Sequence, residues 1–238
     1  GATENTMLAA VLAEGKTTIK NAAMEPEIVD LQNFLNKMGA KITGAGTKEI
    51  IIIGVQKLEN VSYRVMPDRI EAGTFLCAAA ITGGNIQIQD IIPDHLTPVM
   101  MKLEECGCQI IVGKDIIQIN APDKLKATDI KTMPYPGFPT DMQSIFATVL
   151  TKAKGTSIVV ENIFENRYRY IPELKKMGAK AKIEGRTAVI TGVRKLTASK
   201  VKSTDLRGGA GLVTAGLMAR GKTTVTDIDY ILRGYENL

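Results

Sequence analysis

A unit of about seventy residues occurs four times in this 238-residue chain, and the repetition limits the fold more than any other feature. Each copy contains a glycine turn that leads into a strand rich in β-branched residues. The turns begin at Gly15, Gly84, Gly155 and Gly221, with spacings of 69, 71 and 66 residues. This period is longer than that of the common solenoids, so each copy holds enough elements for about a third of a compact domain.

The sequence pattern within one copy alternates between helix and strand. In the first copy it predicts a helix over 6–14, a strand over 17–21, a helix over 26–38, and strands over 40–43 and 50–53. The fold class is therefore α/β, built from repeated units.

A second glycine follows the later helix in three copies, at Gly39, Gly107 and Gly178. A helix that ends just before a strand commonly uses a left-handed residue at this point, and glycine adopts that conformation most readily. We therefore predict that these three glycines cap their helices in the left-handed conformation.

Bulk composition excludes several classes of protein. Trp is absent, and aliphatic residues and Met supply the apolar content, as in helices packed on sheets. The formal net charge is +5, but Lys and Arg are spread along the chain, which argues against a nucleic-acid partner. No segment approaches the roughly 20 apolar residues that cross a bilayer, so we expect no membrane partner either.

The three cysteines, Cys77, Cys106 and Cys108, are odd in number and few for the chain length. This usage indicates a reducing compartment, the cytoplasm. Cys106 and Cys108 are too close in sequence for a usual zinc site, and the one histidine, His95, lies outside the pair. We expect buried structural thiols and no metal site.

The later copies place an acid at or beside the start of an Ala- and Gly-rich helix, namely Asp68, Asp141 and Asp205. The local interpretation is helix capping, and two capping boxes fit it, Asp68 with Glu71 and Thr140 with Gln143. For Asp68 we adopt this interpretation.

Arginines accompany Asp141 and Asp205, namely Arg167 in the connection that follows Asp141 and Arg207 two residues after Asp205. An arginine that follows a strand is more often a solvated surface residue or the partner of a carboxylate than a ligand clamp. The residues alone therefore leave a structural role open for each of these side chains.

Several strings of residues resemble the signature segments of the UDP-N-acetylglucosamine 1-carboxyvinyltransferases, an enolpyruvyl transferase family. The strings are Ala23-Met24-Glu25-Pro26-Glu27-Ile28-Val29-Asp30, Phe138-Pro139-Thr140-Asp141-Met142-Gln143, Phe164-Glu165-Asn166-Arg167, Thr204-Asp205-Leu206-Arg207 and Arg233-Gly234-Tyr235-Glu236. They occur in the family's order and spacing over essentially the whole chain. Their combination is far more specific than any one string.

The resemblance implies a two-domain enzyme in which each domain, an inside-out α/β barrel, contains three βαβαββ-type units. Residues 1–64 would be the last unit of one domain, and residues 65–238 would form most of the other. Residues 61–64 would cross between the domains as part of a hinge. We expect the chain to begin on the first helix of a repeat unit, without the strands that should come before that helix. We also expect it to stop at Leu238, inside the second helix of the fourth copy. The upstream half of the same protein would then be a missing partner.

The implied activity is the transfer of the enolpyruvyl group of phosphoenolpyruvate to the 3'-hydroxyl of UDP-N-acetylglucosamine, with release of phosphate. This reaction is the first committed step of peptidoglycan synthesis and so serves cell-wall biogenesis, cell shape and cell division. It needs a base at the hydroxyl, cations on the phosphate and carboxylate, and a site closed to water. No organic cofactor is implied, because phosphoenolpyruvate is itself the activated donor.

The resemblance also implies roles for individual residues. Asp141 corresponds to the carboxylate at the attacking hydroxyl, and Arg233 to an arginine that binds phosphoenolpyruvate. Arg167, Asp205 and Arg207 match cleft residues that ligand binding or closure brings together, while Arg69 and Glu25 stay evenly balanced between site and structure. The full set of implied substrate-binding residues is Gly1, Thr140, Asp141, Ile163, Phe164, Arg167, Asp205, Leu206, Arg207 and Arg233.

The family's reactive cysteine, on a mobile loop, would lie upstream of Gly1. None of the three cysteines present can replace it, so we expect these 238 residues alone to turn over no substrate. Two alternatives stay open: the sister 3-phosphoshikimate 1-carboxyvinyltransferase, which shares the repeats, and a non-catalytic repeat protein of the same fold.

Overall fold

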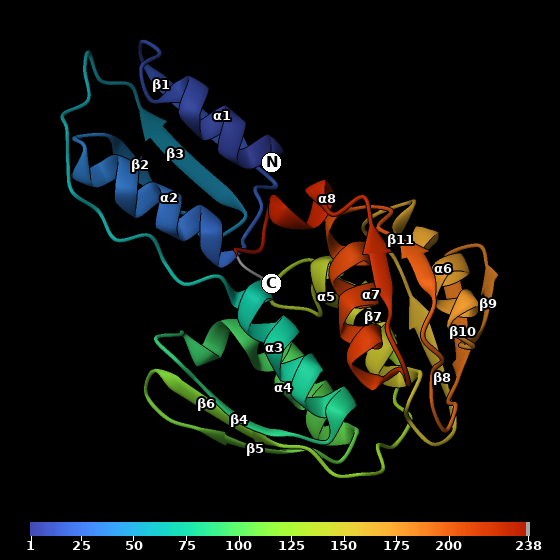
Figure 1. Ribbon diagram of the computed structural model, residues 1–238. Coiled ribbons are helices and arrows are strands. Elements are labelled where there is room, and N and C mark those ends of the chain that lie inside the picture. The colour runs from blue at the N-terminus through green and yellow to red at the C-terminus, as the bar shows by residue number, and fades with distance from the viewer. Residues whose placement is uncertain (237–238) are drawn as a thin grey trace. The chain divides into compact units, whose positions relative to one another are not determined.

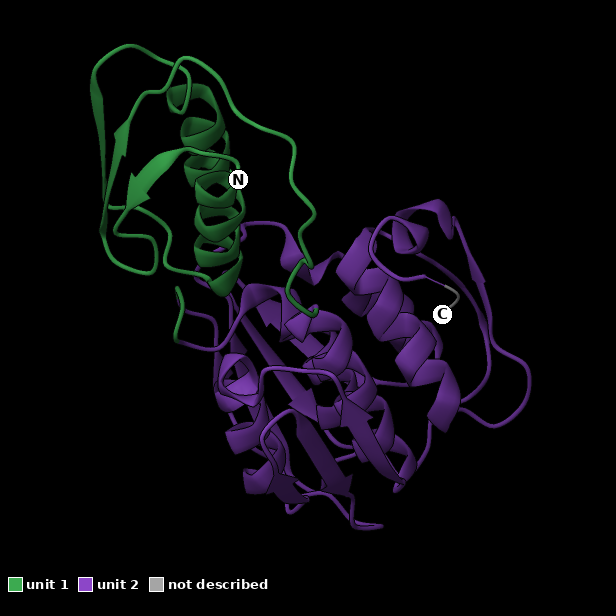
Figure 2. Cartoon of the chain, turned by 90° about the vertical axis from the view of Figure 1, so that its left-hand side faces the viewer, with its two compact units in different colours: residues 1–67, 134–136 green, residues 68–133, 137–238 purple. Residues whose placement is uncertain are grey.

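The computed structural model describes residues 1–236, which form two compact units. The first unit contains residues 1–67 and 134–136, and the second contains residues 68–133 and those from 137 onward (Figure 2). Each unit has its own cluster of buried apolar side chains. Residues 237–238, where the predicted fourth copy stops, lie outside the described part. The assignment of residues 1–64 and 65–238 to two larger domains stays a prediction.

The first unit is one copy of the repeat, in which two helices pack on a three-stranded antiparallel sheet of order β1-β3-β2. Its elements are α1 (Ala2–Ala10), β1 (Lys16–Lys20), α2 (Pro26–Lys37), β2 (Lys41–Thr43) and β3 (Glu49–Ile53). Alternation along β3 explains the packing, because Ile50 and Ile52 are fully buried while their neighbours face outward.

The first helix differs from its predicted span of 6–14. It runs from Ala2 to Ala10, and residues 11–15 form a turn that ends at Gly15 with φ +85°. The chain needs this turn to reverse its direction into β1, so the apolar residues near position 12 do not extend the helix. The remaining four predicted elements of this copy are present within one residue of their ends.

The second unit holds the other three copies (Figure 1). Its helices are α3 (Arg69–Thr82), α4 (Thr97–Glu105), α5 (Thr140–Leu150), α6 (Ile171–Lys176), α7 (Leu206–Met218) and α8 (Asp229–Leu232), with short 3₁₀ helices at Pro93–Leu96 and Arg167–Tyr170. Its strands are β4 (Asn85–Gln89), β5 (Gln109–Val112), β6 (Ile116–Asn120), β7 (Ile130–Lys131), β8 (Thr156–Val160), β9 (Lys180–Glu184), β10 (Thr187–Thr191), β11 (Lys200–Lys202) and β12 (Thr224–Thr226).

The strands form three sheets, of order β4-β6-β5, β7-β8-β10-β9 and β11-β12. In the third copy, β7 runs parallel to β8, and β8, β9 and β10 continue as antiparallel neighbours. The order β7, α5, β8, α6, β9, β10 is a complete βαβαββ unit. The predicted α/β class with repeated units of this type is therefore confirmed.

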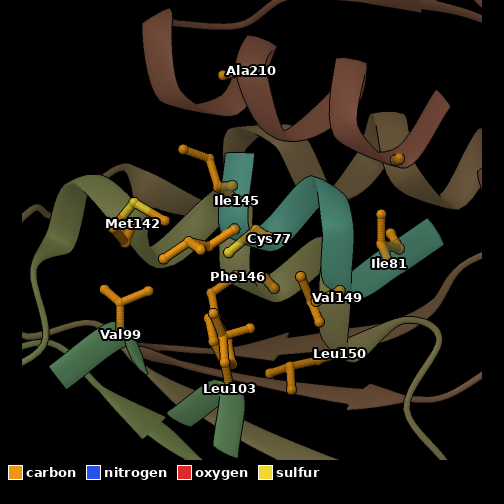
Figure 3. Packing of buried hydrophobic residues seen from close by; sticks show 14 of the residues in the cluster. Cys77, Ile81, Val99, Leu103, Met142, Ile145, Phe146, Val149, Leu150 and Ala210 are labelled. Carbon is orange, nitrogen blue, oxygen red and sulfur yellow. The ribbon is translucent and has the colours of Figure 1, made fainter. Parts of the chain in front are cut away.

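The first helices of the three copies, α3, α5 and α7, pack against one another at the centre of the second unit. Helix α5 is buried along most of its length, and Ile145 and Phe146 lie in the same cluster as Cys77 of α3 and Ala210 of α7 (Figure 3). Close packing of α7 on α5 depends on Gly211, since a Cβ there would lie 3.0 Å from the carbonyl oxygen of Ser144. Helices at the centre with sheets around them give the inside-out arrangement.

The predicted helix caps at Gly39, Gly107 and Gly178 are confirmed by φ angles of +100°, +97° and +89°. Each follows a helix and precedes a strand. The repeat is thus visible in the backbone as well as in the residue pattern.

The segment over residues 61–66 is held along α2 within the first unit. The hydroxyl of Tyr63 donates to Asp30 Oδ1 at 2.8 Å, the rings of Tyr63 and Phe34 lie 5.2 Å apart, and Lys37 Nζ donates to the Ser62 carbonyl at 2.7 Å. A hinge role for residues 61–64 stays a prediction. Among residues 1–236, no helix is long and apolar enough to span a bilayer.

Candidate active site

Three charged side chains from distant parts of the sequence meet at the first turns of α5 and α7. The carboxylate of Asp141 lies between two arginines: Arg167 Nη2 is 3.1 Å from Oδ1, and Arg207 Nη2 and Nε are 3.1 and 3.2 Å from Oδ2. The arginine side chains are 9% and 12% exposed, whereas Asp141 is 40% exposed. The carboxylate therefore has a rigid cationic wall on one side and an open side toward solvent.

The position of Asp141 within its helix explains why the carboxylate is available. In the second and fourth copies the corresponding helices begin after Asp68 and Asp205, each of which caps two backbone N–H groups of its own helix. In the third copy the cap position is Pro139, whose ring has no hydrogen-bond acceptor, and the acid stands two residues later. Asp141 thus gains from the helix dipole without being used as a cap.

The predicted capping box of Thr140 with Gln143 is wrong. Thr140 is the first helical residue rather than the cap, and its hydroxyl donates to the carboxylate of Glu161 at 3.0 Å. Gln143 is fully buried, and its Oε1 accepts a hydrogen bond of 3.1 Å from Tyr170. Thr140 and Gln143 are therefore bonded to tertiary partners, Glu161 just after β8 and Tyr170 in the neighbouring 3₁₀ helix, and neither caps the helix.

Glu161, directly after β8, is 3% exposed and organises the surrounding turn. Its Oε1 accepts from the Thr132 hydroxyl at 2.8 Å and from the backbone N–H groups of Ile163 and Phe164, each at 2.9 Å. The Thr140 oxygen in turn accepts from Arg167 Nε at 3.2 Å. One continuous set of hydrogen bonds therefore runs from this buried carboxylate to Arg167 and on to Asp141.

Phe164 lies next to the same arginine. The guanidinium carbon of Arg167 is 4.5 Å from the centroid of the Phe164 ring, a cation–π geometry. The ring of Phe164 is half exposed, as is Ile163. The backbone of this turn is thus anchored inward while its two side chains face outward.

Arg207 is held from the other side by Tyr235. Its Nη1 donates to the Tyr235 hydroxyl at 3.3 Å, and its guanidinium carbon is 5.6 Å from the ring centroid. Burial by itself would lower the pKa of Arg207, but Asp141 and Tyr235 act in the opposite direction, and the pKa is raised above its ordinary value. Arg207 therefore stays cationic over the whole working range of pH.

The Tyr235 hydroxyl also lies 2.8 Å from the hydroxyl of Thr74 on α3. Thr74 gives its own proton to the Ile70 carbonyl at 2.8 Å, so the proton between the two hydroxyls belongs to Tyr235. The segment after α8 is thereby tied to both α3 and α7.

The other residues implied by the resemblance lie outside the ion-pair cluster. Asp205 caps α7 by accepting from Arg207 N and Gly208 N, and Leu206 packs beneath Gly234, where a Cβ would be 3.0 Å from Leu206 Cδ2. Arg233 follows α8 and is exposed, and it forms no ion pair with any residue in the range 1–236. Gly1 belongs to the first unit and the rest to the second.

Sequence reasoning missed Glu161, Thr132 and Thr74 as members of this site. Thr132 and Thr74 carry no local signal, because they join the site through strand pairing and helix packing. Glu161 does carry a sequence signal, because a polar residue recurs at its place in every copy. It stands six residues after the repeat glycine, as do Asn21, Asp90 and Asp227 in the other copies. Across residues 1–236, no group of three or more His, Cys, Asp or Glu side chains is arranged to hold a metal ion.

Relatives with curated names match almost the whole chain. A protein of Caldanaerobacter subterraneus subsp. tengcongensis named UDP-N-acetylglucosamine 1-carboxyvinyltransferase 1 is 58% identical over 235 residues, which cover 99% of this chain and 57% of the relative. UDP-N-acetylglucosamine 1-carboxyvinyltransferase 2 of Carboxydothermus hydrogenoformans is 56% identical over 238 residues, which cover 99% of this chain and 57% of that relative. The chain therefore spans a little over half the length of these relatives.

Solved structures with the same fold agree with this relationship. The enolpyruvyl transferase NikO from Streptomyces tendae superposes with a TM-score of 0.87 at 26% identity, over 99% of this chain and 56% of that one. The EPSP synthase from Acinetobacter baumannii has a TM-score of 0.69 at 21% identity, over 96% of this chain and 56% of that one. At this identity the likeness shows the fold alone. The model of the EPSP synthase (3-phosphoshikimate 1-carboxyvinyltransferase) family matches residues 1–238, and the chain therefore belongs to this family of enolpyruvyl transferases.

Proposed function

We propose that the protein containing this chain transfers the enolpyruvyl group of phosphoenolpyruvate to the 3'-hydroxyl of UDP-N-acetylglucosamine and releases phosphate. The sugar hydroxyl adds to C2 of the donor while C3 gains a proton. The tetrahedral intermediate then loses phosphate from C2 and one proton from C3, which restores the double bond in the product. The observation that carries the proposal is the identity of 56–58% to relatives that all bear the UDP-N-acetylglucosamine name.

Asp141 is the proposed acceptor of the hydroxyl proton. A carboxylate oxygen can accept about two hydrogen bonds, and Oδ1 of Asp141 accepts one, from Arg167. With 40% of the side chain exposed, a substrate hydroxyl can approach the same oxygen. The two arginines prevent rotation of the carboxylate, so positioning supplies part of the rate.

Arg167, Arg207 and Arg233 are the proposed cations for the anionic groups of the substrates. Guanidinium groups suit phosphate and carboxylate because they present parallel N–H donors. Arg233, exposed after α8 and without an ion pair among residues 1–236, keeps all its donors for a ligand. Arg167 and Arg207 already hold Asp141, so their first role is to orient the base.

The turn at residues 163–164 is the proposed contact for the nucleotide sugar, together with Gly1, Thr140, Asp205 and Leu206. The N–H groups of Ile163 and Phe164 are both occupied by Glu161. Any backbone hydrogen bond from this turn to a sugar must therefore use a carbonyl oxygen, which would accept from an N–H or O–H of the ligand.

The competing acceptor is shikimate 3-phosphate, the substrate of the enzymes after which the family is named. Titration calorimetry of the full-length protein separates the two: we expect UDP-N-acetylglucosamine to bind and shikimate 3-phosphate not to bind at the same concentrations. The reverse order of affinities contradicts the proposal. Binding of neither, with no release of phosphate, supports the non-catalytic alternative. We place the reaction in peptidoglycan synthesis and in the cytoplasm.

A further inference from the structure

Glu161 carries a buried carboxylate directly after β8. Its two oxygens accept from the hydroxyls of Thr132 and Thr140 and from the N–H groups of Ile163 and Phe164, all of which are neutral donors. Within residues 1–236, it forms no ion pair with a Lys or Arg. Burying a charge in this way is costly unless every oxygen is satisfied, and a fold has no need of it at the end of a strand.

The other copies of the repeat show what the fold itself requires at this position. Six residues after the repeat glycine they have Asn21, Asp90 and Asp227, with φ angles of +55°, +56° and +56°. These are the only described non-glycine residues with positive φ among residues 1–236, and short polar side chains tolerate that conformation. Glu161 departs from its three counterparts both in side-chain length and in backbone conformation.

The departure occurs in the copy that carries Asp141. The longer side chain of Glu161 reaches back to the first residue of α5, where Thr140 in turn accepts from Arg167. The same carboxylate turns two successive N–H groups inward. The Asp or Asn side chains at the counterpart positions are one methylene shorter. They could not reach both the first residue of the helix and the two backbone N–H groups.

We propose that Glu161 is a positioning residue for the transfer reaction. Through Thr140 it sets the place of Arg167, and so of Asp141, and through the N–H groups of Ile163 and Phe164 it turns the carbonyls of that turn toward the substrate. This inference rests on the proposed function, because it names what holds that site in order.

The test is Glu161→Gln in the full-length protein. The amide keeps the shape but places an NH₂ group against Thr140, where it competes with Arg167 for the hydroxyl oxygen. Charge-assisted hydrogen bonds are roughly twice as strong as neutral ones. We therefore expect kcat/KM for the sugar nucleotide to fall at least tenfold, mainly through KM, and the amides of residues 162–167 to exchange hydrogen about tenfold faster.

Asp90→Asn is the matched control at the corresponding position of the second copy, and Asn21 shows that Asn fits this backbone conformation. It should leave both the kinetics and the exchange of residues 162–167 within twofold of wild type. Thr140→Ser should keep most activity because it keeps the hydroxyl, whereas Thr140→Val should lose it. Glu161→Gln added to Thr140→Val should raise KM further only by the part of the effect that runs through the N–H groups of Ile163 and Phe164, since the part that runs through Thr140 is already lost.

Faster exchange together with a raised KM supports the proposal. Unchanged kinetics overturn it, whether or not exchange changes, because Glu161 would then be only structural; a kinetic loss with unchanged exchange overturns the positioning mechanism. If the wild-type protein uses shikimate 3-phosphate and not UDP-N-acetylglucosamine, the proposed function fails. The kinetics of the same variants are then measured with shikimate 3-phosphate as the acceptor, which tests the role of Glu161 separately.

Discussion

Asp141 and Arg207 occupy the same place, the second residue, of two corresponding helices in the repeat, and an ion pair of 3.1 Å joins them. The third helix of the set, α3, has the buried Ile70 at this position. A change of residue at one position in two copies of the repeat has thus placed a carboxylate and a guanidinium group opposite each other. Asp141 became available because Pro139 replaces the acid that caps the other two helices.

Replacing Asp141 by Asn should reduce kcat of the full-length enzyme by about 100-fold or more, since a positioned general base contributes roughly that much. The amide keeps the size of the side chain but cannot take the hydroxyl proton. Steady-state kinetics with both substrates measure the loss. Asp115→Asn, at an exposed turn of the same unit, should leave kcat unchanged. A fall of less than threefold for Asp141→Asn would remove Asp141 from the role of base.

Arg207→Lys should lower kcat/KM about tenfold although the charge is kept. Lysine cannot make the paired N–H contacts with Asp141 or lie over the ring of Tyr235. The exposed Arg194→Lys is the control and should behave as wild type. Equal kinetics for both variants would mean that charge alone matters at Arg207.

Tyr235→Phe should lower the free energy of unfolding by about 1–2 kcal/mol, because it removes the hydrogen bonds to Thr74 and Arg207 in a buried place. Denaturant titration measures this change. Tyr230→Phe, at a side chain that is about half exposed, should change the free energy of unfolding by less than about 0.5 kcal/mol. Equal free energies of unfolding for the two variants would show that the hydrogen bonds of the Tyr235 hydroxyl do not stabilise the unit.

The three cysteines should resist alkylation in the native protein at pH 8. Burial, reinforced by neighbouring charge, raises the pKa of Cys106 to about 12; burial raises the pKa of Cys108 to about 11 and that of Cys77 well above its ordinary value. A raised pKa leaves almost no thiolate at pH 8, and thiolate is the reactive form. Mass spectrometry after iodoacetamide treatment should show labelling of these positions only in denaturant. Rapid labelling of the native protein would contradict their structural role.

Gly192→Ala should unfold or severely destabilise the second unit. A Cβ at Gly192, directly after β10, would lie only 1.6 Å from the carbonyl oxygen of Ala153, shortly after α5, so the backbone at one of these two places must move. Gly113→Ala is the control, because the nearest atom to its Cβ is 3.6 Å away. Circular dichroism on heating compares the two. A Gly192→Ala melting temperature close to that of the control would show that this close approach is easily relieved.

The sequence was sufficient for the repeats, the α/β class and the three glycine caps, because each depends on residues that are neighbours in the chain. The resemblance implied that Arg167 and Arg207 are cleft residues, but it did not predict that both contact Asp141. Residues 26 and 66 positions away cannot be paired by local pattern. The Thr140 capping box failed for a related reason. The buried carboxylate of Glu161, directly after β8, accepts from the Thr140 hydroxyl instead, and only the tertiary structure shows this contact.

Release of phosphate from phosphoenolpyruvate by the full-length protein, with UDP-N-acetylglucosamine or shikimate 3-phosphate as the acceptor, decides whether the proposed function is right. We expect stoichiometric release with UDP-N-acetylglucosamine, at a rate that Asp141→Asn lowers by about 100-fold or more, and no release with shikimate 3-phosphate. Release with shikimate 3-phosphate alone, or release with UDP-N-acetylglucosamine that is as fast without the Asp141 carboxylate, would contradict the proposal.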